Sequence, residues 1–333
     1  MKDIDLNVFS FDYDLTLNTF LMNADGKIYH RYGSRDEKDA LSWISMKSLI
    51  TVMNRTLIEH KNYQKNPTYK APTTKKYIND FPAYSKTLQQ NKKNNCIRCH
   101  QVHDAIHAQM KADGKWSKES LWIYPDPKLL GLTLDSLIQN KIKNITSSSP
   151  AAKAGLKSGD VILTIDNHNV LTISDMEYVL HHLSNDVSTV EINYTREAKP
   201  FKTQIKTFKN WKKVTPLEYS WRPTMWALTP KPGFGGDLLK DDELKKLQLK
   251  KSSFAFRVRY LVTWGQFART GQNAIKAGIK KGDVIYEVDG KNDFKNMKHY
   301  HSWFRFSHEA GDTVTFKIIR GNKKLDLKMK TIK

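Results

Sequence analysis

The sequence predicts an α+β multidomain protein, and three observations support this fold class. A twelve-residue stretch that begins at Ala151 returns in similar form at Ala274, which indicates a duplicated domain. The first 61 residues combine a hairpin pattern with an amphipathic helix. Between these parts, residues 62–127 contain the only two cysteines of the chain, followed by a helical pattern.

Length and composition describe an ordinary globular protein. A chain of 333 residues has room for two or three domains, and 39% hydrophobic and 11% aromatic residues can form their cores. No run of 18 apolar residues occurs, so we expect no transmembrane helix. The formal net charge is +21, but only 11 of the 55 basic residues are arginine and the lysines are scattered. Because arginine is the side chain suited to bidentate recognition of phosphates and bases, we expect no nucleic-acid partner.

The first element of the chain is a predicted β-hairpin over residues 19–33, with Asp25-Gly26 at its turn. An amphipathic helix is predicted from residue 39 to about residue 61. A hairpin followed by a closing helix resembles the C-terminal half of a thioredoxin-like domain, although Asn18 stands where that family places a cis-proline. The resemblance implies a partial thioredoxin-like α/β unit over residues 1–61.

The segment Cys96-Ile97-Arg98-Cys99-His100 has the most specific chemical pattern. Two cysteines at this spacing can both bond the vinyl groups of one haem, and the histidine after them can bind the iron. The pattern predicts haem c on Cys96 and Cys99, with His100 as an axial ligand. It lies in a predicted helical haem-motif segment, residues 62–127, in which a haem would supply the apolar centre. A second axial ligand stays open among Met22, His30, His60 and Met225.

Two other sites fit the same cysteines. A Cys-X-X-Cys pair can be a redox or structural dithiol. His103 and His107 lie four residues apart on the helix predicted from residue 101 to about residue 112. Together with Cys96 and Cys99, these histidines form a possible zinc site. The sequence leaves haem, dithiol and zinc open.

The duplicated stretch occupies residues 151–162 and 274–285, and each copy continues into a short strand, a helix and a strand pair. Gly155 and Gly278 are expected at positive φ, where each closes a helical turn. The shared pattern A-x-x-A-G-[LI]-x-x-G-D-V-I resembles PDZ domains of the bacterial, protease-associated kind. This resemblance implies two PDZ-like β-barrel domains.

In PDZ folds a C-terminal peptide adds as a strand, and backbone amides of a short loop hold its carboxylate. The resemblance implies that protein or peptide C-termini bind the first domain through Leu130, Gly131, Leu132 and Leu134. The second domain has no clean match, and the nearest candidate, residues 250–254, lacks the glycine. We therefore expect tighter peptide binding by the first domain.

The predicted organisation has five segments: a thioredoxin-like half (1–61), the Cys-X-X-Cys-His segment (62–127), PDZ domain 1 (128–209), a Trp- and Pro-rich linker (210–236) and PDZ domain 2 (237–333). This order, together with Phe11-Asp12-Tyr13-Asp14 and Trp221-Arg222-Pro223, resembles a bacterial thioredoxin-like/PDZ (seleno)protein family. The resemblance implies that Met1 is not the natural start and that a signal sequence and a Cys- or selenocysteine-containing half precede it. It also implies a periplasmic or otherwise extracytoplasmic location in a bacterium.

These features lead to two functional hypotheses. The first is an extracytoplasmic redox or electron-transfer protein with a covalent c-type haem, docked to partners through its PDZ domains and serving an unknown redox partner. The alternative is a non-enzymatic PDZ scaffold or peptide-binding protein whose Cys-X-X-Cys-His site is a structural zinc or dithiol site. No hydrolase or protease active site can be assigned from the sequence, so the question of an enzymatic role stays open.

Overall fold

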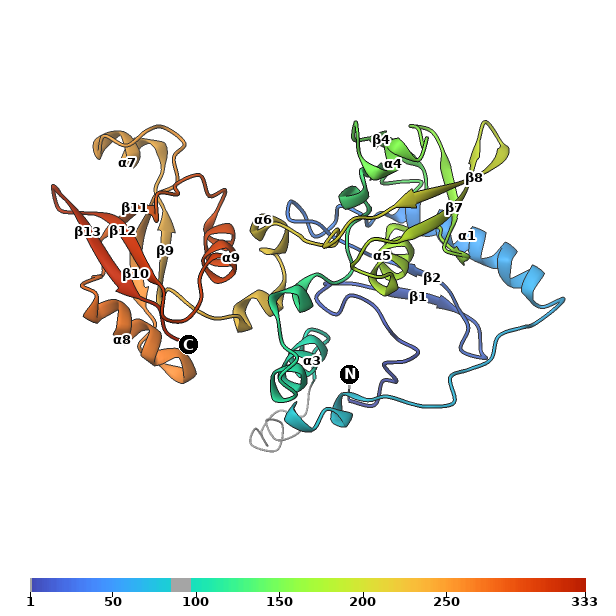
Figure 1. Cartoon of the computed structure of the whole chain (residues 1–333), viewed down its shortest axis with the longest axis horizontal. Helices are drawn as coiled ribbons and strands as arrows, with labels where there is room; N and C mark the ends of the chain where they lie inside the picture. The colour runs from blue at the N-terminus through green and yellow to red at the C-terminus, as the bar shows by residue number, and fades with distance from the viewer. Residues whose placement is uncertain (1, 85–96) are drawn as a thin grey trace. The chain divides into compact units, whose positions relative to one another are not determined.

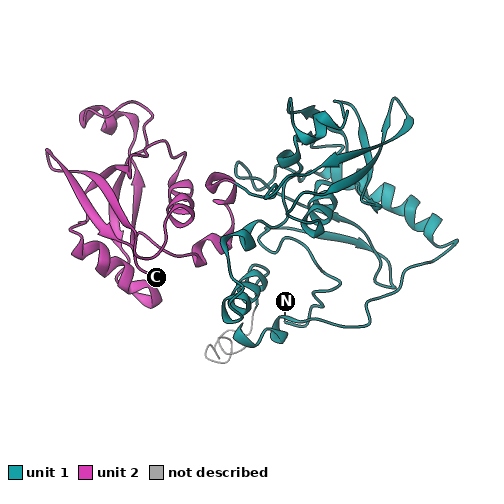
Figure 2. Ribbon diagram, viewed as in Figure 1, with its two compact units in different colours: residues 1–214 teal, residues 215–333 magenta. Residues whose placement is uncertain are grey.

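The computed structural model describes residues 2–84 and 97–333. It divides into two compact units, unit 1 (residues 1–214) and unit 2 (residues 215–333), which are coloured separately in Figure 2. Each unit contains one copy of the repeat, and we describe each by itself.

Unit 1 begins with the expected hairpin. Strands β1 (Thr19–Met22) and β2 (Ile28–Tyr32) pair antiparallel, and Gly26 takes a φ of +88° at the turn (Figure 1). The prediction of a hairpin with Asp-Gly at its turn is confirmed. The wider thioredoxin-like interpretation stays a prediction.

Helix α1 (Met46–Tyr63) follows the hairpin and begins later than expected. The Asp36 carboxylate accepts bonds from the backbone N–H groups of Lys38 and Asp39 and from the Ser42 hydroxyl, which holds this stretch in turns. Ser45 then caps the helix by accepting a bond from the N–H of Ser48. The polar residues before position 46 therefore form the approach to the helix.

The segment after α1 contains helix α3 (Gln101–Ala112), as predicted, and two short 3-10 helices, η1 (Ile78–Asp80) and η2 (Lys118–Leu121). One side of α3 packs on aromatic side chains from the start of the chain and from residues 78–84. The buried members of this cluster are Leu6, Phe11, Tyr13, Ile78, Phe81, Tyr84, Val102 and Ala105. Protein side chains thus form the apolar centre that was expected from a haem.

The first repeat completes unit 1. Its elements are η3 (Pro127–Leu130), β3 (Leu132–Leu134), β4 (Ile142–Ile145), α4 (Pro150–Lys153), β5 (Val161–Ile165), β6 (His168–Asn169), α5 (Ile173–His182), β7 (Thr189–Arg196) and β8 (Lys199–Lys206). Strands β3 and β4 form one small sheet, and β6, β5, β7 and β8 form another in that order. Helix α5 buries Ile173, Met176 and Leu180 in the core that both sheets share.

Unit 2 contains the second repeat, built around one five-stranded sheet. Its elements are α6 (Pro216–Tyr219), η4 (Pro223–Ala227), β9 (Phe234–Leu238), α7 (Asp241–Lys246), β10 (Phe256–Leu261), η5 (Gly265–Phe267), α8 (Ala268–Lys276), β11 (Val284–Val288), α9 (Met297–Ser307), β12 (Thr313–Arg320) and β13 (Lys323–Lys330). The strand order is β13-β12-β11-β10-β9. Across the described strands the sheets of both repeats stay open, so the mixed α+β class is confirmed and the expected closed barrels are wrong.

An aspartate–arginine ion pair occurs within each of the two repeats. The repeat pattern predicted only the aspartate of each pair. Asp160 and Asp283 each accept a bond from the backbone N–H three residues earlier, as expected for a turn-capping aspartate. Each carboxylate also binds an arginine, Arg196 at 2.7 Å in the first repeat and Arg320 at 2.8 Å in the second. Each arginine also donates a hydrogen bond to the carbonyl of the turn glycine, Gly155 or Gly278. These glycines have φ values of +78° and +92°, so the predicted positive φ is confirmed.

We expect the substitution Asp283→Ala to destabilise unit 2 by about 2 kcal/mol, because it removes a buried acceptor from both Arg320 and a backbone N–H. The expected loss is no larger because the Arg320 side chain is 34% exposed, so water replaces part of the lost bond. Urea denaturation of the full chain measures the loss. The exposed Asp326 on β13 supplies the control, and a loss for Asp326→Ala as large as for Asp283→Ala would contradict the role of the ion pair.

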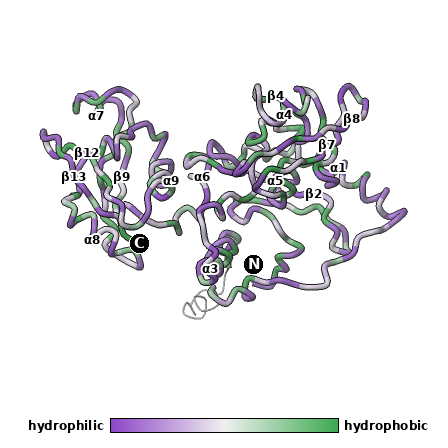
Figure 3. Tube along the Cα trace, in the orientation of Figure 1, coloured by the Kyte–Doolittle hydropathy of each residue, from purple (hydrophilic) through white to green (hydrophobic). Residues whose placement is uncertain are grey.

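Figure 3 shows that hydrophobic and hydrophilic residues are interspersed in both units. Within the described residues, no helix combines the length and the apolar character needed to cross a membrane.

Candidate functional site

The predicted haem ligands lie at the start of α3, and the structure describes only some of them. Cys96 lies outside the described residues. The Cys99 side chain is partly buried against the aromatic cluster under α3, and His100 occupies the position just before the helix. The ligand set Cys96, Cys99 and His100 therefore stays a prediction.

His103 and His107, the histidines of the alternative zinc set, are both buried on α3 with their rings stacked 6.3 Å apart. The His103 Nε2 atom lies 3.3 Å from the Asp12 carboxylate. His107 packs against Trp116, and burial lowers its pKa to about 3, so its imidazole is neutral. Whether these histidines join Cys96 and Cys99 at a metal stays a prediction.

The structure brings together a different group that could hold a metal ion. One ligand atom each from Asp12, Asp14 and His103 lies within 4.8 Å of the others, and all three residues are buried. Two carboxylates and an imidazole suit several divalent cations. The sequence signal was the Phe11-Asp12-Tyr13-Asp14 string, which carries no spacing that points to the distant His103.

The predicted peptide-binding residues of the first repeat lie together. Gly131 takes a φ of +93° between η3 and β3, and its carbonyl accepts the N–H of Thr146 at 2.9 Å. A Cβ atom at Gly131 would meet the Ser149 Oγ at 2.1 Å, so this turn requires glycine. Leu130, Leu132 and Leu134 flank the turn and belong to the same hydrophobic cluster as Val179 and Leu180 of α5. We call the strip between β3 and α5 the first seam.

The first seam is covered by residues 33–43 of the chain itself. The Ser34 hydroxyl donates to the Glu177 carboxylate on α5, and Glu37 pairs with Lys128 of η3 at 3.5 Å. At the other end of β3, the Gln139 side chain donates to the Trp43 carbonyl at 2.7 Å, and the Trp43 ring packs on the core of the repeat. The predicted peptide-binding side chains are themselves buried in the hydrophobic core of the repeat. Their exposed fractions are 1% for Leu130, 2% for Leu132 and 4% for Leu134.

His30 links the hairpin to α5. The sequence indicated this residue only as a possible haem ligand. His30 is 1% exposed and lies between the carboxylates of Asp175 on α5 (2.8 Å) and Glu59 on α1 (2.9 Å). Burial alone would lower the pKa of His30, but the hydrogen bonds and charges of the two carboxylates outweigh it and raise the pKa to about 9. A protonated His30 therefore joins the hairpin, α1 and α5.

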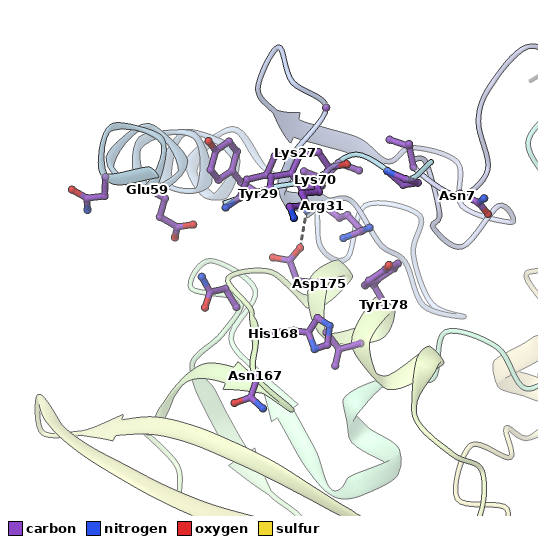
Figure 4. A pocket seen from close by; sticks show the side chains of 18 residues that line it. Asn7, Lys27, Tyr29, Arg31, Glu59, Lys70, Asn167, His168, Asp175 and Tyr178 are labelled. Atoms are coloured by element: carbon purple, nitrogen blue, oxygen red, sulfur yellow. Dashed lines mark hydrogen bonds between the residues drawn. The ribbon is translucent and has the colours of Figure 1, made fainter. Parts of the chain in front are cut away.

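A cavity of about 660 Å³ lies beside this junction (Figure 4). The Arg31 backbone N–H donates to Asp175 at its edge, and the Arg31 guanidinium stacks 3.4 Å over the Tyr178 ring. Lys27 and Lys70 also line the cavity. Its lining comes from the hairpin, α1 and α5, and also from residues 7–8, 69–72 and 167–169.

The second repeat has an equivalent turn at Gly233. From the sequence we expected this turn at residues 250–254, which is wrong. Gly233 takes a φ of +80° just before β9, and its carbonyl accepts the N–H of Val262 at 2.7 Å, matching the Gly131 bond. Residues 250–254, the expected location, lie in the connection between β9 and β10. The strand equivalent to β3 is therefore β9, which forms the edge of its sheet, and we call the strip between β9 and α9 the second seam.

Comparison with known proteins agrees with this geometry. A family model described as a PDZ domain matches residues 128–207 and 269–331, one segment in each repeat. The chain therefore contains PDZ domains, as the repeat pattern predicted.

Two curated relatives match a shorter stretch. A "Serine protease Do-like HtrA" from Lactobacillus helveticus is 42% identical over 64 residues, which is 19% of this chain and 15% of that protein. A "Putative zinc metalloprotease" from Borreliella burgdorferi is 39% identical over 64 residues, which is 19% of this chain and 14% of that protein. The matched stretch thus spans about one seventh of either relative.

Two solved structures also match. An "HtrA-type protease AlgW with decapeptide" has a TM-score of 0.25 at 12% identity, covering 52% of this chain and 54% of that chain. A photosystem II D1 C-terminal processing protease has a TM-score of 0.21 at 18% identity, covering 50% of this chain and 46% of that chain.

These matches correct the first functional hypothesis. The two curated relatives are named as a serine protease and a putative zinc metalloprotease, with no reference to haem or electron transfer. The expectation of a haem redox or electron-transfer function is therefore wrong. The matches favour the alternative hypothesis, a PDZ protein that binds peptides.

Proposed function

We propose that this chain is a peptide-binding PDZ protein, in which a partner's C-terminal segment adds to β3 of the first repeat. Gly131 would place the backbone near the terminal carboxylate, and Leu130, Leu132 and Leu134 would contact the apolar side chains of the peptide. One observation carries the proposal. Strand β3 pairs only with β4 among the described strands, so its other edge can accept a peptide strand beside α5.

We call residues 33–43 the covering segment, and we propose that it competes with the peptide for the first seam. Its contacts reach both walls of the first seam, through Glu177 on α5 and Lys128 on η3. A peptide would have to displace these contacts before its side chains reached Leu132 and Leu134. We therefore propose that the first seam binds peptides weakly until this segment is released.

Only 64 residues of this chain match the two proteases, so we do not extend their activity to it. In this proposal the Cys96-Ile97-Arg98-Cys99-His100 segment has a structural role, as a dithiol or a zinc site. A location outside the cytoplasm fits a relative of the HtrA type and stays part of the proposal.

A peptide titration tests both parts. The double variant Ser34→Ala/Glu37→Ala removes the two contacts that tie the covering segment to the walls. We expect this variant of the full chain to bind free C-terminal peptides from a library about tenfold more tightly than the natural chain. Tenfold corresponds to about 1.4 kcal/mol, which is the scale of one lost hydrogen bond to a charged group. Fluorescence anisotropy of labelled peptides measures the affinities.

Two controls define the outcome. Leu41→Ala changes a side chain of the same segment that is 63% exposed, and it should leave the affinity unchanged. Peptides with an amidated C-terminus should bind much more weakly than those with a free carboxylate. Equal affinity for the double variant and the natural chain would refute the covering role. Absence of binding to both proteins would refute peptide binding by the first repeat.

A further inference from the structure

Two segments that are far apart in the sequence bring three metal-binding side chains together in unit 1. Asp12 and Asp14 lie in the loop before β1, and His103 lies in the first turn of α3. One ligand atom from each lies within 4.8 Å of the other two. The exposed fractions of Asp12, Asp14 and His103 are 4%, 3% and 4%, so the group is closed off from solvent.

The spacing of two of these atoms matches the spacing around a bound ion. The Asp12 Oδ1 and His103 Nε2 atoms are 3.3 Å apart, whereas His30 contacts its two carboxylates at 2.8 and 2.9 Å. Zinc bonds to oxygen and nitrogen are about 2.0 to 2.2 Å long, so two ligand atoms on a tetrahedral ion lie about 3.4 Å apart. Asp12 and His103 therefore already have the separation that a shared ion requires, and a short movement would bring the Asp14 carboxylate to the same distance.

Neighbouring groups hold the ligand side chains in place. The backbone N–H of Asp14 donates to Asp12 Oδ1 at 3.1 Å, which orients that carboxylate within the loop. The His103 ring packs against the Tyr13 ring, with 5.3 Å between centres, and stacks on the His107 ring at 6.3 Å. Support of this kind orients the ligands of metal sites and strengthens metal binding.

A further carboxylate beside the group indicates that the ligand is a cation. Asp104 follows His103 on α3, and its buried Oδ1 atom has no hydrogen-bond partner among the described residues. Asp104 is also close enough to Asp14 for the two negative charges to repel each other. A buried acceptor without a partner is costly, and a metal ion held by Asp14 would replace the repulsion by an attraction.

We propose that Asp12, Asp14 and His103 bind a divalent transition-metal ion, preferably Zn²⁺, which joins the start of unit 1 to α3. A set of two carboxylates and one imidazole suits zinc or manganese, whereas calcium and magnesium favour ligand sets made of oxygen alone. Zinc binds more tightly than manganese to a given set of such ligands. The ion would cross-link residues that are 91 positions apart, so its role is structural.

This metal site is independent of the peptide binding proposed for the first repeat. It uses His103, so that histidine cannot also complete a zinc site with Cys96 and Cys99. The metal site and the cysteine site therefore predict different effects of the same substitutions.

Calorimetric titration of the full chain with zinc chloride tests the site. The titration uses a Cys96→Ser/Cys99→Ser chain, whose missing thiols cannot bind the ion, and this chain should still bind Zn²⁺. Adding Asp14→Asn or His103→Gln should weaken that binding by about a hundredfold or more, because losing a supporting group alone costs about 10- to 100-fold. Adding His168→Gln, which alters an exposed histidine of the same unit, should leave the affinity unchanged.

A thermal unfolding assay gives a second measurement. Zn²⁺ should raise the Tm of unit 1 saturably in the natural chain and in the cysteine double variant, and the rise should be lost with His103→Gln. Loss of zinc binding in a folded cysteine double variant would overturn the proposal and assign the zinc to the cysteines. Unchanged zinc binding with both Asp14→Asn and His103→Gln, or tighter binding of Mg²⁺ than of Zn²⁺, would also overturn it.

The absorption spectrum of the natural chain with Co²⁺ decides the matter if the cysteine double variant does not fold. A site made of oxygen and nitrogen ligands gives weak visible bands, whereas a thiolate ligand adds a strong near-ultraviolet band. Visible bands that disappear with Asp14→Asn would support the proposed site. A spectrum with the thiolate band that Asp14→Asn leaves unchanged would overturn it.

Discussion

His30→Gln is expected to lower the stability of unit 1 by about 3 kcal/mol at pH 6 and to remove most of its pH dependence between pH 6.5 and 9. The pKa of His30 rises from an ordinary 6.5 to about 9 on folding, because Asp175 and Glu59 favour the protonated ring. A group whose pKa is raised on folding stabilises fully below its unfolded pKa. That stabilisation is lost as the pH rises through the folded value, and each tenfold gain in proton affinity on folding corresponds to about 1.4 kcal/mol.

Urea denaturation of the full chain at half-unit pH steps from 6 to 9.5 measures this effect. His168→Gln is the matched control, because His168 is exposed and its Nδ1 contacts only the Asp166 carbonyl. The natural chain should lose stability steadily toward pH 9, whereas His30→Gln should be nearly flat. A natural chain whose unit 1 gained stability across this window would contradict a protonated His30.

Gly233→Ala is expected to destabilise unit 2 by about 4 kcal/mol. Its φ of +80° costs an L-residue roughly 1 to 2 kcal/mol. In addition, the new Cβ would lie 2.1 Å from the Thr270 backbone oxygen, so the chain on one side must move. Overlap of this kind in a packed region costs about 1 to 3 kcal/mol.

Gly290→Ala separates these two contributions, because Gly290 has nearly the same φ, +78°, and nothing within 4 Å of its Cβ position. This control should lose only the conformational part, about 1 to 2 kcal/mol. Chemical denaturation followed by circular dichroism measures both variants. Equal losses of unfolding free energy in the two variants would mean that the close approach to Thr270 does not contribute to the destabilisation.

The elements that could be predicted from the sequence depend on local patterns. The Asp25-Gly26 turn and helix α3 follow from neighbouring residues, and the PDZ segments follow from an internal repeat of twelve residues. The Gly233 turn was missed because the second repeat carries an insertion, with helix α7, between β9 and β10. Counting back from the repeat pattern therefore led to residues 250–254 instead of Gly233.

The candidate sites depend on contacts between distant parts of the chain, which no local pattern encodes. His30 meets Asp175 across 145 positions, and Ser34 meets Glu177 across 143. The same limit applies to the core beside Cys99, which the local motif did not indicate. Phe11, Phe81 and Val102, which are far apart in the sequence, instead meet in one core beside it.

Both repeats contain the arginine–aspartate pair and the glycine turn. We infer that the single domain already had both features before it was duplicated. At corresponding helix positions facing the seams, the copies differ, with Glu177 and His181 in one and His301 and Arg305 in the other. Duplication thus preserved the scaffold and left these positions free to diverge. The two repeats therefore share one framework but carry different charged and polar side chains beside their seams.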